Sequence, residues 1–400
     1  MTRPTLTTFT QPSRVAVLHH VIAAILALGS LSAADWPGWR GPERTGAAPA
    51  ESALRDTFGP GKELAPAWEF TVPTPGGKTP NYACPIITGG RVIQRVSNGT
   101  EDLVVAVDLE TGKEAWTFRV AGGKAKYAAP NTPCVVDGKL FFIGSQGSAF
   151  CLNAANGTEV WTTPLNSKGG TFTSSPLVAA GLMVVCDGAV VALDAMSGAK
   201  RWENKDVKCG HTSPALWRGT AASRLIVGAG KDVLAALDPA TGTKVYELPG
   251  GINSSPVISG DLLATTFHQG GFNLYRLAAD KAERVSTMPL DTDDNQSGSP
   301  ALVAGKAYGF DAKKGYCLDT ATGKPVWEVA VGGKTSSPIV VGNRLLILSG
   351  KNLNLVDAET GKVLSTTAIT SVGHSSPAYA DGCLVVNANT VVRCYDLRSR

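Results

Sequence analysis

The chain has 400 residues, of which 45 are glycine and 24 are proline, and only 18% are charged. A hydrophobic fraction of 43% excludes a disordered chain, which would need low hydrophobicity and a high net charge. Evenly spread glycine and proline exclude a mostly helical protein. The net charge of +4 is distributed without basic blocks, so no nucleic-acid partner is expected.

The first 34 residues are typical of an export signal. Arg3 and Arg14 precede an apolar stretch at 15–28, and the small residues at 32–34 suit cleavage after the last of them. An uncleaved anchor helix is the alternative, but the stretch is shorter than the ~18 apolar residues of a membrane span. No cysteine follows the stretch directly, so a lipid anchor is not expected. We predict a periplasmic or secreted chain with no transmembrane segment after cleavage.

Eight cysteines follow, one by one, at positions 84, 134, 151, 186, 209, 317, 383 and 394. None belongs to a Cys-x-x-Cys, a Cys-x-x-Cys-His or an adjacent pair. This spacing excludes zinc-ribbon, thioredoxin-like and c-type haem sites, while export allows disulfides.

A nine-residue phrase recurs along the chain. Its first copy runs from Asp108 through Gly112 to Trp116, and in intact copies an aromatic residue stands eight positions after the Asp or Asn. Further copies begin at positions 153, 194, 238, 319 and 357, and a decayed copy lies near 278. A second phrase, commonly Ser-Ser-Pro, precedes each copy, with proline at 85, 133, 176, 214, 256, 300, 338 and 377. The prolines span 292 residues over seven intervals, about 42 per repeat, which is the length of a four-stranded propeller blade.

Each repeat is predicted to form four short strands. In the third repeat, apolar runs at 175–179, 182–186 and 190–193 are followed by a turn at 194–198 and a last run at 199–204. Asp can bond to the following backbone in such a turn, and Gly accepts the left-handed conformation. Because proline cannot donate in a ladder, the first strand of each blade should be an edge that faces the central channel.

The repeats predict an all-β, eight-bladed propeller of four-stranded antiparallel blades. Eight first strands and eight third strands are present, but only seven fourth strands follow Pro85. The run at 67–72 resembles a fourth strand, so we expect it to close the last blade beside 391–395, which limits exposed edges. The predicted domains are a signal peptide at 1–34, an N-terminal capping segment at 35–64 and the propeller at 65–400.

The two phrases resemble the PQQ-like repeat of the quinoprotein alcohol dehydrogenase-like propellers, over about residues 68–395. That family is eight-bladed, and the resemblance implies that its tryptophans dock between blades. We assign this structural role to Trp68, Trp116, Trp161, Trp202 and Trp327; a sugar-stacking surface is the alternative. WD40 repeats differ, because there Trp directly precedes the Asp. The stretch 35–46 also resembles the leader of exported members and is expected to cap one face.

A fold alone does not decide the function of a protein, and the resemblance implies two possible functions. One is that of the outer-membrane assembly lipoprotein of the same fold, a scaffold. The other is a PQQ-dependent dehydrogenase of alcohols or sugars, with calcium held by carboxylates and amides and with adjacent cysteines over the quinone. Adjacent cysteines are absent here, and no Asp or Glu stands in the three positions before any repeat proline, although a hard cation prefers charged oxygens. We predict a non-catalytic, monomeric scaffold for an envelope protein or small ligand, without a cofactor; PQQ with calcium is the alternative.

Side chains three positions before the prolines are candidate ligand contacts at the channel entrance. They are Tyr82, Thr173, His211, Asn253, Ser297, Thr335 and His374, with Pro130 in the eighth place. Strand alternation points them the same way as the residue just before the proline. The alternative is that they satisfy backbone groups of the edge strands, since half-buried polar groups need partners. We predict no catalytic residue and no metal ligand.

Cys383 and Cys394 are a candidate disulfide. They lie on two predicted strands joined at 387–390, and if Val386 pairs with Val391 the two cysteines are directly opposite. Opposed residues at non-hydrogen-bonded sites have Cα atoms ~4.5 Å apart, which a disulfide allows. A slip in register would separate them, and lone strand cysteines are often just small buried hydrophobes.

Overall fold

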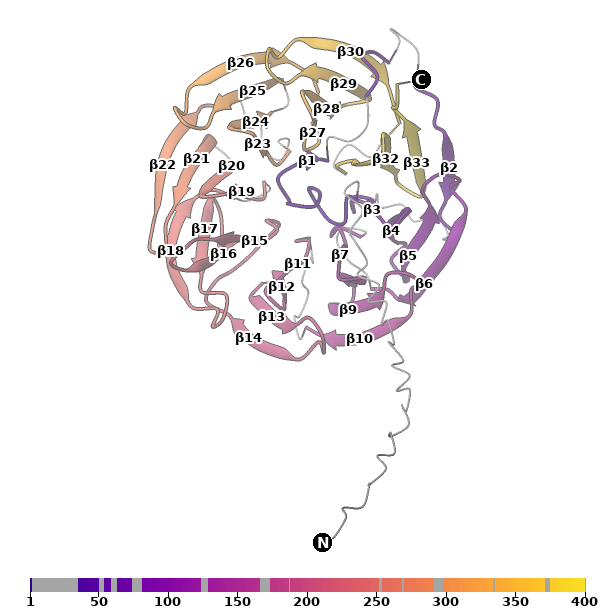
Figure 1. The fold of residues 1–400 in the computed structure, drawn as a ribbon, viewed down its shortest axis with the longest axis vertical. Coiled ribbons are helices and arrows are strands. Elements are labelled where there is room, and N and C mark those ends of the chain that lie inside the picture. The colour runs from indigo at the N-terminus through magenta and orange to yellow at the C-terminus, as the bar shows by residue number, and fades with distance from the viewer. Residues whose placement is uncertain are drawn as a thin grey trace. The chain divides into compact units, whose positions relative to one another are not determined.

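Each repeat forms one four-stranded antiparallel sheet, and the sheets are arranged in a ring with the first strand of each innermost (Figure 1). The computed structural model describes residue 1 and residues 35–49, 54–58, 63–73, 81–123, 129–165, 173–186, 188–251, 254–267, 270–290, 298–311, 313–333, 335–370 and 375–399. The predicted signal peptide, apart from Met1, lies outside these residues. Within them, no helix has the length and apolar character needed to cross a membrane.

The blades follow the chain in order. Blade 1 consists of β3 (Ile86–Thr88), β4 (Arg91–Ser97), β5 (Glu101–Asp108) and β6 (Glu114–Ala121), and blade 2 of β7 (Cys134–Val136), β8 (Lys139–Ile143), β9 (Ser148–Asn153) and β10 (Glu159–Pro164). Blade 3 consists of β11 (Leu177–Ala179), β12 (Leu182–Cys186), β13 (Val190–Asp194) and β14 (Lys200–Asn204). Blade 4 consists of β15 (Ala215–Arg218), β16 (Ser223–Gly228), β17 (Val233–Leu237) and β18 (Lys244–Pro249).

Blades 5 to 8 continue the pattern. They are β19 (Val257–Ser259), β20 (Leu262–Phe267), β21 (Gly271–Leu277) and β22 (Ala282–Met288); β23 (Ala301–Val303), β24 (Lys306–Phe310), β25 (Lys314–Asp319) and β26 (Pro325–Ala330); β27 (Ile339–Val341), β28 (Arg344–Ser349), β29 (Asn352–Asp357) and β30 (Val363–Ala368), with β1 (Ala47–Ala48) added; and β31 (Ala378–Ala380), β32 (Cys383–Ala388) and β33 (Val391–Asp396) with β2 (Trp68–Thr71). The predicted eight-bladed, all-β architecture is confirmed.

The predicted closure of the ring is also confirmed. β2 pairs antiparallel with β33, so that Trp68 stands opposite Cys394 and Thr71 opposite Val391. Blade 8 thus takes its outer strand from the N-terminal side of the chain and its inner strands from the C-terminal end. Closure of this kind pairs an edge that would otherwise be open.

The repeated turn has the predicted chemistry. The Asp108 carboxylate accepts hydrogen bonds from the backbone N–H and the hydroxyl of Thr111, both at 2.8 Å, and these bonds hold the pKa of Asp108 below its usual value. Gly112 has φ +67°, and a Cβ placed there would lie 2.7 Å from the Trp68 ring. Glycine is therefore required twice, for the left-handed backbone and for the close approach of the tryptophan.

That close approach is the docking contact between blades. The Trp68 indole N–H donates to the Leu109 carbonyl at 2.7 Å, from blade 8 to blade 1. Trp116, Trp161, Trp202 and Trp327 each donate in the same way to a carbonyl of the next blade, at 3.0–3.2 Å. The aromatic residues thus fill the gaps between the outer parts of neighbouring sheets, as large half-apolar side chains with one donor can.

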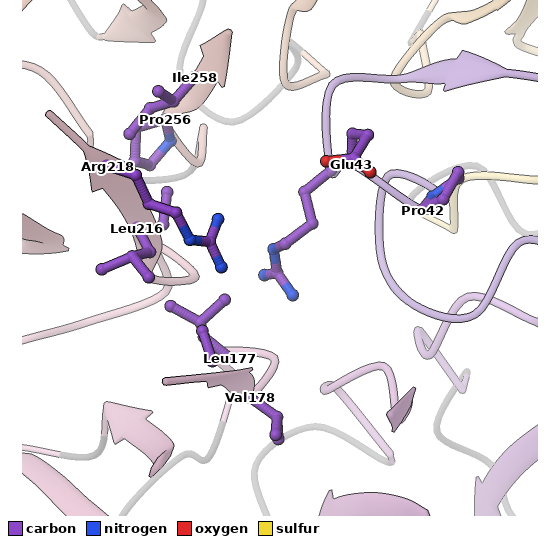
Figure 2. Close-up of a pocket in the computed structure, with 11 residues that line it drawn as sticks. Pro42, Glu43, Leu177, Val178, Leu216, Arg218, Pro256 and Ile258 are labelled. Atoms are coloured by element: carbon purple, nitrogen blue, oxygen red, sulfur yellow. The ribbon is translucent and has the colours of Figure 1, made fainter. Parts of the chain in front are cut away.

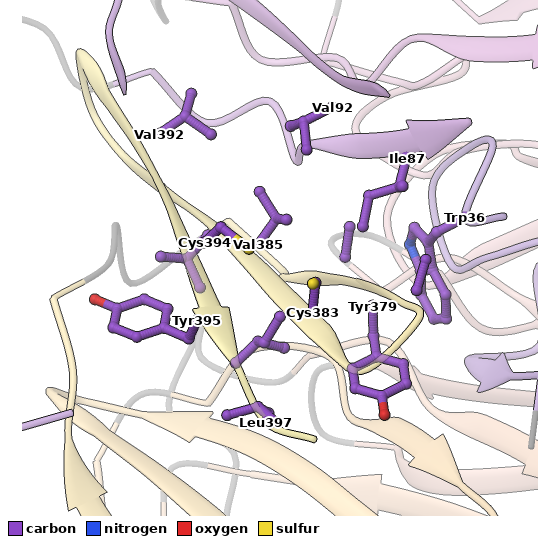
Figure 3. Packing of buried hydrophobic residues seen from close by; sticks show 14 of the residues in the cluster. Trp36, Ile87, Val92, Tyr379, Cys383, Val385, Val392, Cys394, Tyr395 and Leu397 are labelled. Atoms are coloured by element: carbon purple, nitrogen blue, oxygen red, sulfur yellow. The ribbon is translucent and has the colours of Figure 1, made fainter. Parts of the chain in front are cut away.

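The register expected for Cys383 and Cys394 is wrong by two residues. β32 continues to Ala388, which pairs with Val391, so Cys383 stands opposite Asp396 and Cys394 opposite Val385 (Figure 3). The cause is a tighter turn than expected, made possible by Asn389 at φ +73°. The thiols now occupy diagonal positions, where Cα atoms are ~7–8 Å apart, beyond the usual disulfide range. Both cysteines are buried, free and hydrogen-bonded to each other; the disulfide itself stays a prediction for non-reduced peptide mapping.

Candidate functional site at the channel mouth

The residue before each repeat proline contributes to a closed ring of hydrogen bonds, which we call the inner hoop. The backbone N–H of each donates to the side chain of the equivalent residue in the next blade, at 2.9–3.2 Å. The donors and acceptors run Cys84 to Thr132, Thr132 to Ser175, Ser175 to Ser213, Ser213 to Ser255, Ser255 to Ser299, Ser299 to Ser337, Ser337 to Ser376, and Ser376 to the Cys84 sulfur. This explains the repeated hydroxyl before the proline, whose role the sequence interpretation missed.

The channel-entrance candidates lie two positions before the residues of this hoop. His211 Nδ1 and Thr173 Oγ1 are 2.7 Å apart, so two candidates from neighbouring blades meet. Thr335 is buried and donates to the Asp311 carbonyl at 3.2 Å, which fits the alternative that these side chains satisfy backbone groups. Tyr82 is half-buried. Asn253, Ser297 and His374 lie outside the described residues, so a ligand role for the set stays a prediction.

The segment 35–49 completes the inner edges of four blades. Trp36 and Ile87 exchange backbone hydrogen bonds of 2.7 and 2.9 Å (Figure 3), and the Val135 N–H donates to the Pro37 carbonyl at 2.7 Å. Farther along the segment, the N–H of Leu302 donates to Thr45 and that of Val340 to Gly46, at 3.0 and 2.8 Å. These four donors are the second residues after their repeat prolines, in blades 1, 2, 6 and 7.

Two arginines of the segment bind carbonyls of the repeat prolines. Arg40 is only 2% exposed and donates to the carbonyls of Pro338, at 2.7 Å, and Pro300. Arg44 donates to the carbonyls of Pro176 and Pro214, both at 3.3 Å. Each guanidinium therefore joins two neighbouring blades. Within the described residues neither has a carboxylate at ion-pair distance, and burial lowers the pKa of both.

Trp39 lies close to both cations. The guanidinium carbons of Arg40 and Arg44 each lie 5.9 Å from the centroid of its ring. A cation at this distance is attracted by the negative ring face. The single aromatic side chain thus compensates in part for the missing carboxylates.

A cavity of about 260 Å³ lies beside Arg44 (Figure 2). One wall is formed by residues 42–44, and the others by the inner strands β11 and β15 and the start of β19. The lining side chains belong to Pro42, Glu43, Arg44, Leu177, Val178, Ala179, Ala215, Leu216, Arg218, Pro256 and Ile258. Figure 2 shows the guanidinium of Arg218 extending into the open space. Sequence reasoning missed this site, because its walls come from segments far apart in the chain, at 42–44, 177–179, 215–218 and 256–258.

The described inner surface does not fit PQQ with calcium. No group of three or more His, Cys, Asp or Glu side chains converges within the described ranges. The inner hoop supplies hydroxyls and one thiol, whereas calcium needs several oxygen ligands and prefers charged ones. At the channel mouth Arg40 and Arg44 contact the inner ends of the blades, and their charges would repel a cation. The Asp35 carboxylate of the same segment already accepts the Thr88 hydroxyl and the Gly89 N–H. The donor set therefore disagrees with the one that the resemblance to quinoprotein dehydrogenases implies.

Comparison with known proteins gives the same fold. A family model described as outer membrane protein assembly factor BamB matches residues 65–186, 100–249 and 186–399. The BamB protein of Burkholderia pseudomallei is 24% identical over 318 residues, which are 77% of this chain and 70% of that protein. The quinohemoprotein alcohol dehydrogenase of Comamonas testosteroni is 29% identical over 158 residues, 35% of this chain and 22% of that protein.

Solved structures agree on the architecture. BamB from Moraxella catarrhalis superimposes with a TM-score of 0.65 at 16% identity, over 84% of this chain and 98% of that one. The Comamonas testosteroni dehydrogenase superimposes with a TM-score of 0.68 at 15% identity, over 92% and 81%. At such identities the likeness shows the fold and does not choose between the two functions.

Proposed function

Because the chain belongs to the outer membrane protein assembly factor BamB family, we propose that it is an exported, non-catalytic propeller that binds a protein partner in the cell envelope. The observation that supports this most strongly is the occupation of the channel mouth by the chain itself. Segment 35–49 satisfies the inner edges of four blades, and Arg40 and Arg44 bind the proline carbonyls of blades 6, 7, 3 and 4.

An enzyme of this architecture would need the channel mouth for its cofactor and substrate. Here the same place holds two arginines, two tryptophans and their backbone partners. Arg40 and Arg44 each hold two neighbouring blades together, so these two side chains serve rigidity. A rigid ring that carries loops suits a binding scaffold, since recognition residues are usually carried by loops on a stable frame.

The alternative is a quinone-dependent dehydrogenase or a degenerate relative that has kept cofactor binding. Its support is the match of 158 residues to a quinohemoprotein alcohol dehydrogenase. The donor set of the described residues opposes it, because carboxylates do not converge there.

Competitive capture tests the scaffold role. The exported chain is immobilised and exposed to a lightly cross-linked envelope extract of the source organism, with and without an excess of free chain. We expect a small set of envelope proteins to be retained and to be displaced by the free chain, but not by the heat-unfolded chain. Retention that free chain does not displace, together with quinone-dependent dye reduction by the purified protein, would contradict the proposal.

A further inference from the structure

The cavity beside Arg44 has a mixed lining of charged and aliphatic side chains. Arg44 and Arg218 supply two guanidinium groups, while the other walls are aliphatic, with Leu177, Leu216 and Ile258 as the largest side chains. We propose that this cavity binds a carboxylate attached to a compact apolar group. The inference goes beyond the scaffold role and does not depend on it, since a propeller with either function could carry such a site.

The charge at the cavity is not neutralised by its surroundings. Arg44 is half-buried, and its bonds to the Pro176 and Pro214 carbonyls are long and use neutral acceptors. Arg218 is exposed and makes no ion pair with a described residue. Glu43 also lines the cavity, but it is exposed and stands at ion-pair distance from neither arginine. Two cations and one carboxylate leave a net charge of +1 at the cavity.

A bound anion would be stabilised more by this arrangement than by a fully exposed arginine. Burial lowers the pKa of Arg44, which means that its charge is held at a desolvation cost. A bound carboxylate would reduce that cost and would accept hydrogen bonds from the N–H groups of Arg44 that do not donate to the prolines. A guanidinium offers a planar fork that matches the two oxygens of a carboxylate. Both terminal nitrogens of Arg44 already donate to proline carbonyls, so the guanidinium is held in place and a carboxylate would use the N–H groups that these bonds leave over.

The walls define the rest of the ligand. Leu177 and Val178 come from β11, Leu216 from β15, and Pro256 and Ile258 from blade 5. These side chains give an apolar group a place out of water, which favours binding in proportion to the area covered. The volume of about 260 Å³ lies below the ~300–1,000 Å³ of pockets for drug-sized ligands. A single branched or ring-bearing group fits, whereas a large cofactor does not.

Two sources offer this chemistry. One is a free carboxylic acid of small size, and the other is the C-terminal residue of a peptide with an apolar side chain. Both present one carboxylate and one apolar group a few bonds apart. The site cannot favour inorganic phosphate in the same way, because phosphate has no apolar part to cover the walls.

Calorimetric titration of the purified exported chain separates these possibilities. The probes are 4-methylpentanoate and its amide, acetyl-Gly-Gly-Leu with a free C-terminus and its C-terminal amide, and inorganic phosphate. We expect at least one acid to bind at least tenfold more tightly than its amide and than phosphate. Tighter binding of the small acid points to a free acid, and tighter binding of the peptide points to a chain terminus.

Variants at the exposed end of the site complete the test. Arg218→Gln should weaken the binding of the acid at least tenfold, and Arg218→Glu should abolish it. The matched control is Arg201→Gln, which removes the same charge from β14, where Arg201 pairs with Asp194; it should leave the Kd within about twofold. Equal binding of acid and amide, an unchanged Kd in Arg218→Gln, or no binding at millimolar acid would overturn the proposal.

Discussion

The inner and outer parts of the ring join their blades in different ways. In the inner hoop one kind of bond is repeated at all eight junctions, and seven of the eight acceptors are hydroxyl oxygens. At the rim, tryptophan docks on the next blade at five junctions and Tyr246 donates to the Ala278 carbonyl at a sixth. Ser286 and Ser365 stand at the two remaining positions.

Space explains the difference. The inner strands converge toward the axis, where one small side chain bridges neighbouring backbones. The outer strands diverge, so a large side chain is needed, but the gap can also be filled from elsewhere. Beside Ser365 the filler is Phe58, which is buried and donates its N–H to the Ser365 hydroxyl at 3.0 Å. The rim therefore tolerates the absence of its repeated aromatic residue at some junctions, whereas the hoop keeps its hydrogen bond at all eight.

Removal of the closing strand should have the largest effect on the rim. A chain that begins at Pro73 loses segment 35–49 as well as β2 with Trp68, and β33 becomes an open apolar edge. We expect aggregation, because unpaired edges recruit other chains. Light scattering measures the aggregation and thermal melting gives the Tm, with the chain that begins at Asp35 as the reference. A truncated chain that stays monomeric with an unchanged Tm would disprove closure by β2.

Single rim tryptophans should come next. Trp116→Ala or Trp161→Ala should cost about 3–5 kcal/mol of unfolding free energy, as is usual for a large buried aromatic side chain. Ser286→Ala, at one of the two junctions that lack the aromatic residue, removes only the bond to the Gly323 carbonyl and should cost about 1 kcal/mol. Denaturant titration of the three variants gives these values. Equal losses would show that the rim does not depend on aromatic packing.

Loss of one hydroxyl in the hoop should destabilise the protein less than loss of a tryptophan, but more than the removal of a single oxygen atom suggests. Ser213→Ala leaves the buried N–H of Ser175 without its acceptor, and such a group costs about 1–3 kcal/mol. The control is Ser174→Ala, since the buried Ser174 hydroxyl has no hydrogen-bond partner among the described residues. That control should be neutral or stabilising. If the two alanine variants are equally stable, the hoop contributes nothing.

The smallest effect is expected at the one sulfur of the hoop. Cys84 accepts the Ser376 N–H at 3.2 Å, and sulfur is a weak acceptor. Cys84→Ser restores the acceptor found in six other blades, so stability should change by less than about 1 kcal/mol and in the favourable direction. Burial raises the pKa of the Cys84 thiol, and the native protein should therefore resist alkylation at pH 8. A large loss of stability in Cys84→Ser would mean that the hoop needs the volume of sulfur.

The sequence predicted the parts of this structure that repeat. Fixed spacing predicted the blades and the turn at Asp108, because these depend on residues close in sequence. The docking of Trp116 on the next blade was implied by the family resemblance. The β2 closure could be predicted by counting strands. The register of Cys383 could not, since it depends on how tightly Asn389 turns.

The channel mouth was not predictable for a different reason. Arg40 and Arg44 bind backbone carbonyls, and a carbonyl carries no sequence signal. Their partners lie 130 to 300 positions away, so neither spacing nor composition points to them. The same holds for the cavity, which segment 35–49 forms together with three blades.

If the chain fills its channel mouth with its own residues, a quinone has no site there. Equilibrium dialysis of the exported chain against PQQ, with calcium and with a chelator, tests this directly, followed by dye-linked oxidation of alcohols and sugars. We expect no calcium-dependent binding and no dye reduction above the level of the heat-unfolded chain. Tight, calcium-dependent binding of one quinone per chain, with turnover of an alcohol or a sugar, would contradict the scaffold role.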